Sequence, residues 1–144
     1  MPETVEIFKN KKTGLYLLQR QCPDPELKGP TWIGQPETLS EDQLRRLGVI
    51  KLLEALESSL RPCSDPQLLK HFTDEEHRRF CGAHHCVTIT RWPDGGGQLE
   101  LRPLRRVRGG YRSIQDAKRT ITAKDIQSDL IDEVLSAFEM IENE

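Results

Sequence analysis

The residues best suited to chemistry lie close together between His77 and Cys86, with His71 shortly before them. His77 and Cys81 are four positions apart, so on a helix they would share one face. Together with His84 or Cys86 they could form a tetrahedral zinc site. The spacing matches no standard zinc finger or ribbon, and no second ligand pair occurs elsewhere in the chain. The alternative is that both cysteines are small buried apolar residues, with the histidines at a helix end or strand edge.

The same cluster could in principle support covalent catalysis. His84 or His85 would be the general base, and Cys81 or Cys86 the nucleophile. No catalytic or nucleotide-binding motif accompanies them: G-x-S-x-G, G-x-x-x-x-G-K-[ST] and G-x-G-x-x-G are all absent from the sequence. We therefore expect a protein that is not an enzyme and needs no cofactor.

The charge of the chain is unevenly distributed. The net charge of −2 gives no general attraction to nucleic acid or to an anionic membrane. The segment 102–119 nevertheless holds seven basic residues and a single acid, Asp116. It could bind phosphates, which would make the protein a nucleic-acid or phosphate-binding regulatory module. Two alternatives stay open, a solvated basic surface and ion pairs with the acidic end of the chain.

The chain ends in an acidic stretch, with seven acids and no base between Asp125 and Glu144. Asp125, Asp129, Asp132 and Glu133 fall off the apolar stripe of the helix expected there, so they would be exposed. Carboxylates on one helix face could receive a basic protein partner. The alternative is an ordinary solvated face.

Two hairpins are predicted by alternating apolar residues. Val87 and Ile89 alternate with threonines before the glycine-rich turn 93–97, and a second strand with Leu99 and Leu101 follows it. A similar pattern with Val5 and Ile7 predicts an earlier hairpin that turns near residues 13–14. Residues 22–37 contain four prolines and two glycines, which predicts an irregular segment without strand or helix.

Helices are predicted by capping signals followed by apolar residues at spacings of three and four. Ser40 with Gln43 begins a helix over 40–59, and Thr122 begins another over 123–141. Thr73 with Glu76 begins a shorter helix that ends near residue 82, and Asp65-Pro66 can begin a further short one. Apolar residues surround most of the 40–59 helix. We therefore expect it to be buried on two sides, either inside the fold or at a subunit contact such as a homodimer.

The chain is similar to itself at an offset of 82 residues. Val5 then corresponds to Val87, Leu44 to Ile126 and Val49 to Ile131. The pattern predicts one domain over 1–144, with pseudo-repeat halves at about 1–60 and 84–144. The expected fold is α+β, with a central antiparallel sheet built from two β-hairpins and packed by amphipathic helices.

Four cysteines and the lack of long apolar runs bear on the compartment. The first residues lack the basic and apolar regions of a signal peptide, and no run is long enough to span a bilayer. We therefore expect a cytoplasmic protein without membrane contact, whose four cysteines are reduced thiols. These are Cys22, Cys63, Cys81 and Cys86.

Four segments resemble the immunity proteins of contact-dependent growth inhibition. They are LELRP at Leu99–Pro103, GGY at Gly109–Tyr111, LIDEVLSAFE at Leu130–Glu139, and LLEALESS at Leu52–Ser59. The resemblance implies a cytoplasmic protein that binds a toxin domain delivered by a neighbouring cell, commonly a nuclease, and blocks its active site. It implies no catalysis and no cofactor, and the acidic residues of the last helix would then meet the toxin.

Overall fold

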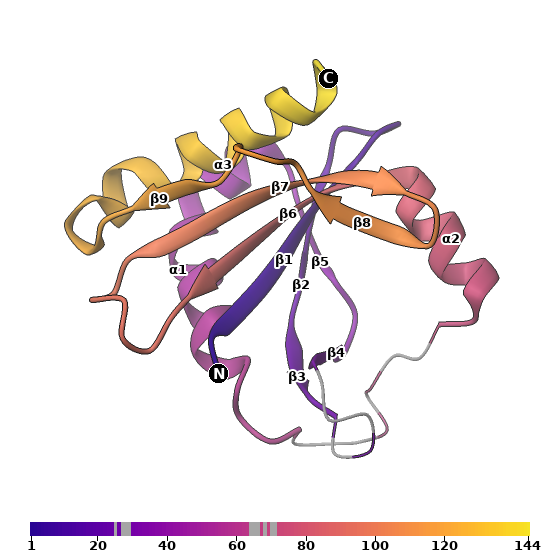
Figure 1. The fold of residues 1–144 in the computed structure, drawn as a ribbon, viewed down its shortest axis with the longest axis horizontal. Helices are drawn as coiled ribbons and strands as arrows, with labels where there is room; N and C mark the ends of the chain where they lie inside the picture. The colour runs from indigo at the N-terminus through magenta and orange to yellow at the C-terminus, as the bar shows by residue number, and fades with distance from the viewer. Residues whose placement is uncertain (25, 27–29, 64–66, 68, 70–71) are drawn as a thin grey trace.

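A seven-stranded antiparallel sheet runs through both halves of the chain (Figure 1). The computed structural model describes residues 1–24, 26, 30–63, 67, 69 and 72–144. The strand order is β5-β2-β1-β6-β7-β8, and β9 also pairs with β7. The strands are β1 (Glu3–Asn10), β2 (Tyr16–Gln19), β5 (Glu37–Leu39), β6 (His84–Arg91), β7 (Leu99–Val107), β8 (Gly110–Ser113) and β9 (Arg119–Ile121).

Both predicted hairpins are present, and local chemistry explains their turns. The Asn10 side chain accepts hydrogen bonds from the amides of Lys12 and Thr13, which closes the turn between β1 and β2. Gly96 and Gly97 have φ values of 69° and 82° in the β6–β7 turn, a conformation that glycine adopts without steric cost. The predicted α+β fold with a hairpin-built sheet is therefore confirmed.

Two long helices, α1 (Glu41–Ser58) and α3 (Ile126–Glu142), cover one face of the sheet. Ser40 and Gln43 form the predicted capping box of α1. Before α3, a 3₁₀ turn at Ala123–Asp125 begins after Thr122, whose hydroxyl donates to the Asp125 carboxylate instead of capping an amide. The shorter α2 (Asp74–Ala83) has the predicted Thr73–Glu76 capping box. Its Phe80 packs on Phe8, which points to the opposite face of the sheet.

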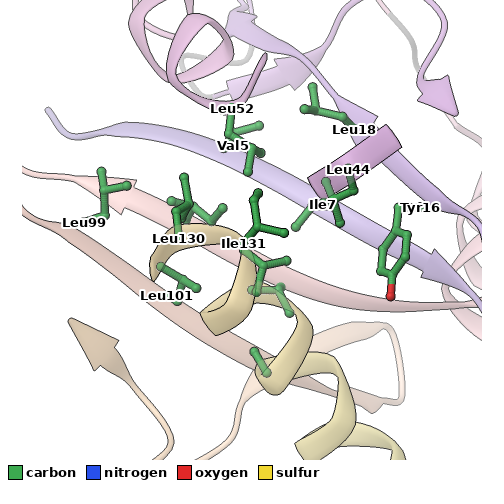
Figure 2. Packing of buried hydrophobic residues seen from close by; sticks show 14 of the residues in the cluster. Val5, Ile7, Tyr16, Leu18, Leu44, Leu52, Leu99, Leu101, Leu130 and Ile131 are labelled. Carbon is green, nitrogen blue, oxygen red and sulfur yellow. The ribbon is translucent and has the colours of Figure 1, made fainter. Parts of the chain in front are cut away.

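The hydrophobic core lies between this helix pair and the sheet (Figure 2). Alternate residues of each central strand point into it, for example Val5 and Ile7 of β1. The helices supply an apolar stripe, as predicted for α3. Fully or nearly fully buried members include Leu18, Leu44, Leu52, Leu56, Val87, Ile89, Leu99, Leu101, Leu130, Val134 and Phe138.

The elements of the two halves correspond at the offset seen in the sequence. β1, β5 and α1 match β6, β9 and α3, and β2 matches the start of β7. β1 and β6 pair in the register Val5↔Ile89, Glu6↔Thr88 and Ile7↔Val87. Exchanging the halves at that offset maps this register onto itself, so the β1–β6 ladder is symmetric about the pair Glu6 and Thr88.

The two helices approach each other closely at Gly48 of α1. A Cβ atom at this position would lie 2.6 Å from Cδ1 of Ile131 in α3 and 3.0 Å from Cδ1 of Leu44. Glycine therefore makes room for side chains in the contact between the helices. This close approach explains a glycine inside a helix, where it is otherwise unfavourable.

Three expectations from the sequence are wrong in this region. Residues 22–37 are not irregular throughout, because β3 (Gln21–Pro23) and β4 (Pro30–Trp32) form a separate two-stranded sheet and β5 begins at Glu37. Cys22 and Cys63 form a disulfide instead of reduced thiols. The α1 helix is buried toward the sheet and α3 and exposes Leu47 and Ile50, so the alternative in which its whole apolar surface is buried inside the fold is wrong.

The structure does not test two further predictions. The subunit contact through α1 stays a prediction. The short helix expected at Asp65-Pro66 lies outside the described residues.

Candidate functional surfaces

The histidine and cysteine cluster lies where α2 joins β6. The Cys81 Sγ atom is 3.6 Å from Nε2 of His77, so the expected pair on one helix face does form. His84 instead donates from Nδ1 to the Phe80 carbonyl oxygen at 2.9 Å, and the Cys86 thiol donates to Glu6 at 3.7 Å. Among the described residues, no three His, Cys, Asp or Glu side chains meet in an arrangement that could hold a metal ion. His71 lies outside those residues.

Burial suppresses the nucleophilic form of both free thiols. It raises the pKa of Cys81, although a hydrogen bond involving Tyr111 and the charge of Arg106 act in the opposite direction. Burial also raises the pKa of Cys86 well above its ordinary value, and the carboxylate of Glu6 adds to the shift. Since the thiolate is the reactive species, neither cysteine is poised for nucleophilic attack at neutral pH.

An aromatic cluster surrounds this junction and explains the burial. The Phe8 ring lies 4.9 Å from Phe80 and 5.3 Å from Trp32, both edge to face. The Tyr111 hydroxyl donates to the His84 carbonyl oxygen at 2.9 Å, which ties the β7–β8 hairpin to the end of α2. The arrangement is that of a packed second core on the face opposite α1 and α3.

Glu6 is a central polar residue of this face that the sequence reasoning missed. Its carboxylate accepts hydrogen bonds from the Gln21 side chain at 2.5 Å and from the Trp32 indole at 3.0 Å. These contacts attach the β3–β4 sheet to the main sheet. The sequence did contain a signal for Glu6, because a carboxylate in the middle of a strand that is expected to be half-buried usually has a hydrogen-bonding partner.

The four acidic residues predicted as a binding surface do not share one environment. Asp129 is exposed and has no counter-ion among the described residues, whereas Asp132 lies 3.1 Å from Arg45 of α1. Glu133 is 2.9 Å from Arg119 of β9, and Asp125 accepts a hydrogen bond from Thr122 at 2.8 Å. Asp129 and Asp132 are therefore the exposed members of the set.

The basic segment 102–119 becomes the end of β7, the hairpin to β8 and the approach to β9. Arg119 pairs with Glu133, and Arg105 pairs with Glu144. These contacts bear out, for two residues, the alternative in which the basic segment pairs with the acidic end of the chain. Arg102 and Lys118 instead lie near Glu100, at 3.3 and 3.8 Å.

These neighbours favour the ionised form of the Glu100 carboxylate. Burial acts to raise its pKa, but hydrogen bonds from Trp92 and Arg102 outweigh that effect, so its pKa is lower than the ordinary value. Three other basic residues of the segment have no acidic partner among the described residues. They are Arg106, Arg108 and Arg112.

Comparison with known proteins shows a similarity of fold only. No known protein family and no curated protein matches the sequence. The structure is similar to that of a protein of unknown function from Neisseria meningitidis, with a TM-score of 0.68. The two share 13% sequence identity over 97% of this chain and 95% of the other. Among the described residues, no helix is long and apolar enough to cross a membrane.

Proposed function

We propose that this chain is an immunity protein of contact-dependent growth inhibition, which binds a toxin domain and blocks its active site. The observation that carries the proposal is the outer face of α3. The helix contains five acidic residues and no basic residue, and Asp129 and Asp132 are exposed on it. A nuclease toxin has a basic surface for its substrate, so this face is complementary to it.

The carboxylates of α3 are presented on a rigid support. Seven residues of the helix are buried against the sheet and α1, among them Leu130, Val134 and Phe138. Such anchoring fixes the position of the outward side chains, which lowers the entropy that binding would cost. A preorganised row of carboxylates is what a tight inhibitor of a basic enzyme requires.

The ion pairs on this face are weak enough to be exchanged for those of a partner. The Arg45 and Asp132 side chains are 50% and 70% exposed, and exposed pairs of this kind contribute roughly 0–1 kcal/mol. A basic residue of the toxin can therefore take the place of Arg45 at little cost. Asp129 is available without any rearrangement.

The segments that resemble immunity proteins occupy defined structural places, which supports the proposal. Leu99–Pro103 lies in β7, and Leu130–Glu139 lies in α3. Gly109 lies in the turn before β8, and Gly110 and Tyr111 begin that strand; both glycines have positive φ, and Tyr111 is anchored on the His84 carbonyl oxygen. These three segments build the sheet and the acidic helix, and the fourth, Leu52–Ser59, forms the end of α1 and its C-cap.

The proposed place of action is the cytoplasm, where an incoming nuclease would reach its substrate. A disulfide such as Cys22–Cys63 forms in oxidising surroundings, and the thiols of cytoplasmic proteins are mostly reduced. Neither cysteine belongs to α3, so the bond is not part of the proposed contact surface. Neither catalysis nor a cofactor is part of the proposed role.

The test is protection against the toxin domain encoded immediately upstream of this chain. We expect co-expression to restore growth, and the purified proteins to bind with a Kd in the nanomolar range, about −12 kcal/mol. We further expect Asp129→Asn with Asp132→Asn to slow association about tenfold at low salt, with less effect at high salt. Stopped-flow mixing and cell survival would measure the two effects.

A matched control comes from α2. Asp74→Asn with Glu75→Gln removes the same charge from exposed positions of a helix on the other face of the sheet. This variant should associate at nearly the rate of the unchanged protein. Equal slowing by both pairs would exclude the outer face of α3 as the contact surface, and absence of protection would exclude the function.

A further inference from the structure

A shallow hollow lies where α2 meets the end of β7, away from the helix pair that carries the acidic surface. It has a volume of about 310 Å³ and is lined by Glu75, Arg78, Arg79 and Arg106. Three of the four side chains carry a guanidinium group. The two elements meet here because Tyr111, paired with Arg106 across β7 and β8, is anchored at the end of α2.

The positive charge of this hollow is only partly balanced. Arg79 lies 3.0 Å from Glu75 one helical turn earlier. Arg78 and Arg106 have no carboxylate partner among the described residues. Two of the arginines that line the hollow therefore have no counter-ion in the described part of the chain.

Arg106 is the unusual member because it is half-buried. Its Nη2 atom donates to the Arg78 carbonyl oxygen at 3.3 Å. Its Nε and Nη1 atoms are out of contact with solvent and have no hydrogen-bond acceptor among the residues that the structure describes. A cation that is removed from water without a partner is costly, and a nearby anion relieves that cost.

We propose that this hollow binds a phosphate group. Guanidinium groups present planar forks of donors that match phosphate oxygens, and Arg78 supplies one that is exposed and has no carboxylate partner in the described part of the chain. Arg106 supplies the second positive charge and Arg79, which is paired with Glu75, the third. The site takes a free phosphate ion or the phosphate of a small phosphorylated molecule, and it is independent of toxin binding by α3.

The probe is inorganic phosphate, added to the full chain at constant ionic strength with chloride as the reference anion. Thermal unfolding should show a saturable rise in Tm, about 3–6 °C at ten times the Kd, because the ligand stabilises the folded state only. Isothermal titration calorimetry should give one site. Adenosine 5′-monophosphate then identifies the source, since tighter binding than phosphate indicates a nucleotide and equal binding indicates the phosphate group alone.

Three variants decide whether the hollow is the site. Arg78→Gln and Arg106→Gln should each weaken phosphate binding at least tenfold, and Arg78 is exposed, so its replacement leaves the fold intact. Arg112→Gln removes another exposed arginine, one whose neighbour across the ladder is Arg105 and not Arg106, and should bind as before. A rise in Tm no larger than that caused by chloride, or full binding by Arg78→Gln, would overturn the proposal.

Discussion

The α1 and α3 helices occupy corresponding places in the two halves of the sheet, yet their outward faces differ. Where α1 exposes Leu47 and Ile50, at 41% and 61%, α3 exposes Asp129 and Asp132. The inward positions are buried in both helices. The corresponding pairs are Leu44 and Ile126, Gly48 and Leu130, Leu52 and Val134, Ala55 and Ala137, and Leu56 and Phe138.

The inward residues of α1 and α3 are required by the fold, whereas the outward residues can be determined by a binding partner. Every inward position packs on the same sheet, so its apolar character is set by burial. Outward positions make no such contacts, and substitutions there usually change stability by no more than about 0.5 kcal/mol. The carboxylates of α3 and the apolar pair of α1 are therefore free to be determined by binding.

The largest expected effect concerns the corresponding core residues Leu56 and Phe138. Both side chains are fully buried in one shared core. We expect Leu56→Ala to lower the free energy of unfolding by about 2–5 kcal/mol and Phe138→Ala by about 3–5 kcal/mol. Urea denaturation followed by circular dichroism and by tryptophan fluorescence would measure both.

The two probes also test whether the halves unfold together. Because both helices share one core, each variant should shift a single transition seen by both signals. Two separate transitions, each sensitive to only one of the variants, would contradict the shared core.

The second effect comes from a bond in the first half, and because the halves share one core it should change the stability of the whole chain. The Cys22–Cys63 disulfide closes a loop with a sequence separation of 41 and has no counterpart in the second half. Loop-closure entropy predicts that reduction lowers the free energy of unfolding by about 3–4 kcal/mol. Denaturation with and without tris(2-carboxyethyl)phosphine measures this, and equal stability in both conditions would show that the bond does not constrain the unfolded chain.

The smallest effect compares two helical glycines. Gly48→Val would place methyl groups against Ile131 at the helix crossing, so we expect a loss of about 1–3 kcal/mol. Gly82 in α2 has nothing within 4 Å of an added Cβ, and Gly82→Ala should raise stability by up to about 1 kcal/mol. A shift of equal sign in both variants would mean that backbone propensity, and not the close approach, governs Gly48.

The sequence predicted those parts of the fold that local physics determines. Alternation at Val87 and Ile89, glycines in the turns, and capping residues such as Ser40 and Thr73 each act over a few residues, and the structure has the corresponding elements. The β3–β4 sheet was not predicted, because its three-residue strands depend on contacts such as Trp32 with Glu6 that join distant parts of the chain.

The chemistry of the candidate sites was harder to predict for the same reason. Sequence spacing brought His77 and Cys81 together, but strand geometry directed Cys86 to Glu6 and the end of α2 directed His84 to Phe80. The hollow at Arg106 is lined by residues of α2 and β7, and no local sequence pattern predicts that these two elements lie next to each other. Cys22 and Cys63 lie too far apart in the chain for their pairing to be recognised by spacing.

The central pairing of β1 with β6 has a consequence for how the protein folds. Contacts across this ladder join residues separated by 74 positions, as in Asn10 and His84, and by 88 positions, as in Glu3 and Arg91. Such distant pairings must form against a large loss of chain entropy, which slows folding. During synthesis the first hairpin therefore has no strand to pair with along β1 until β6 has left the ribosome, so we expect the sheet to form only after most of the chain has emerged.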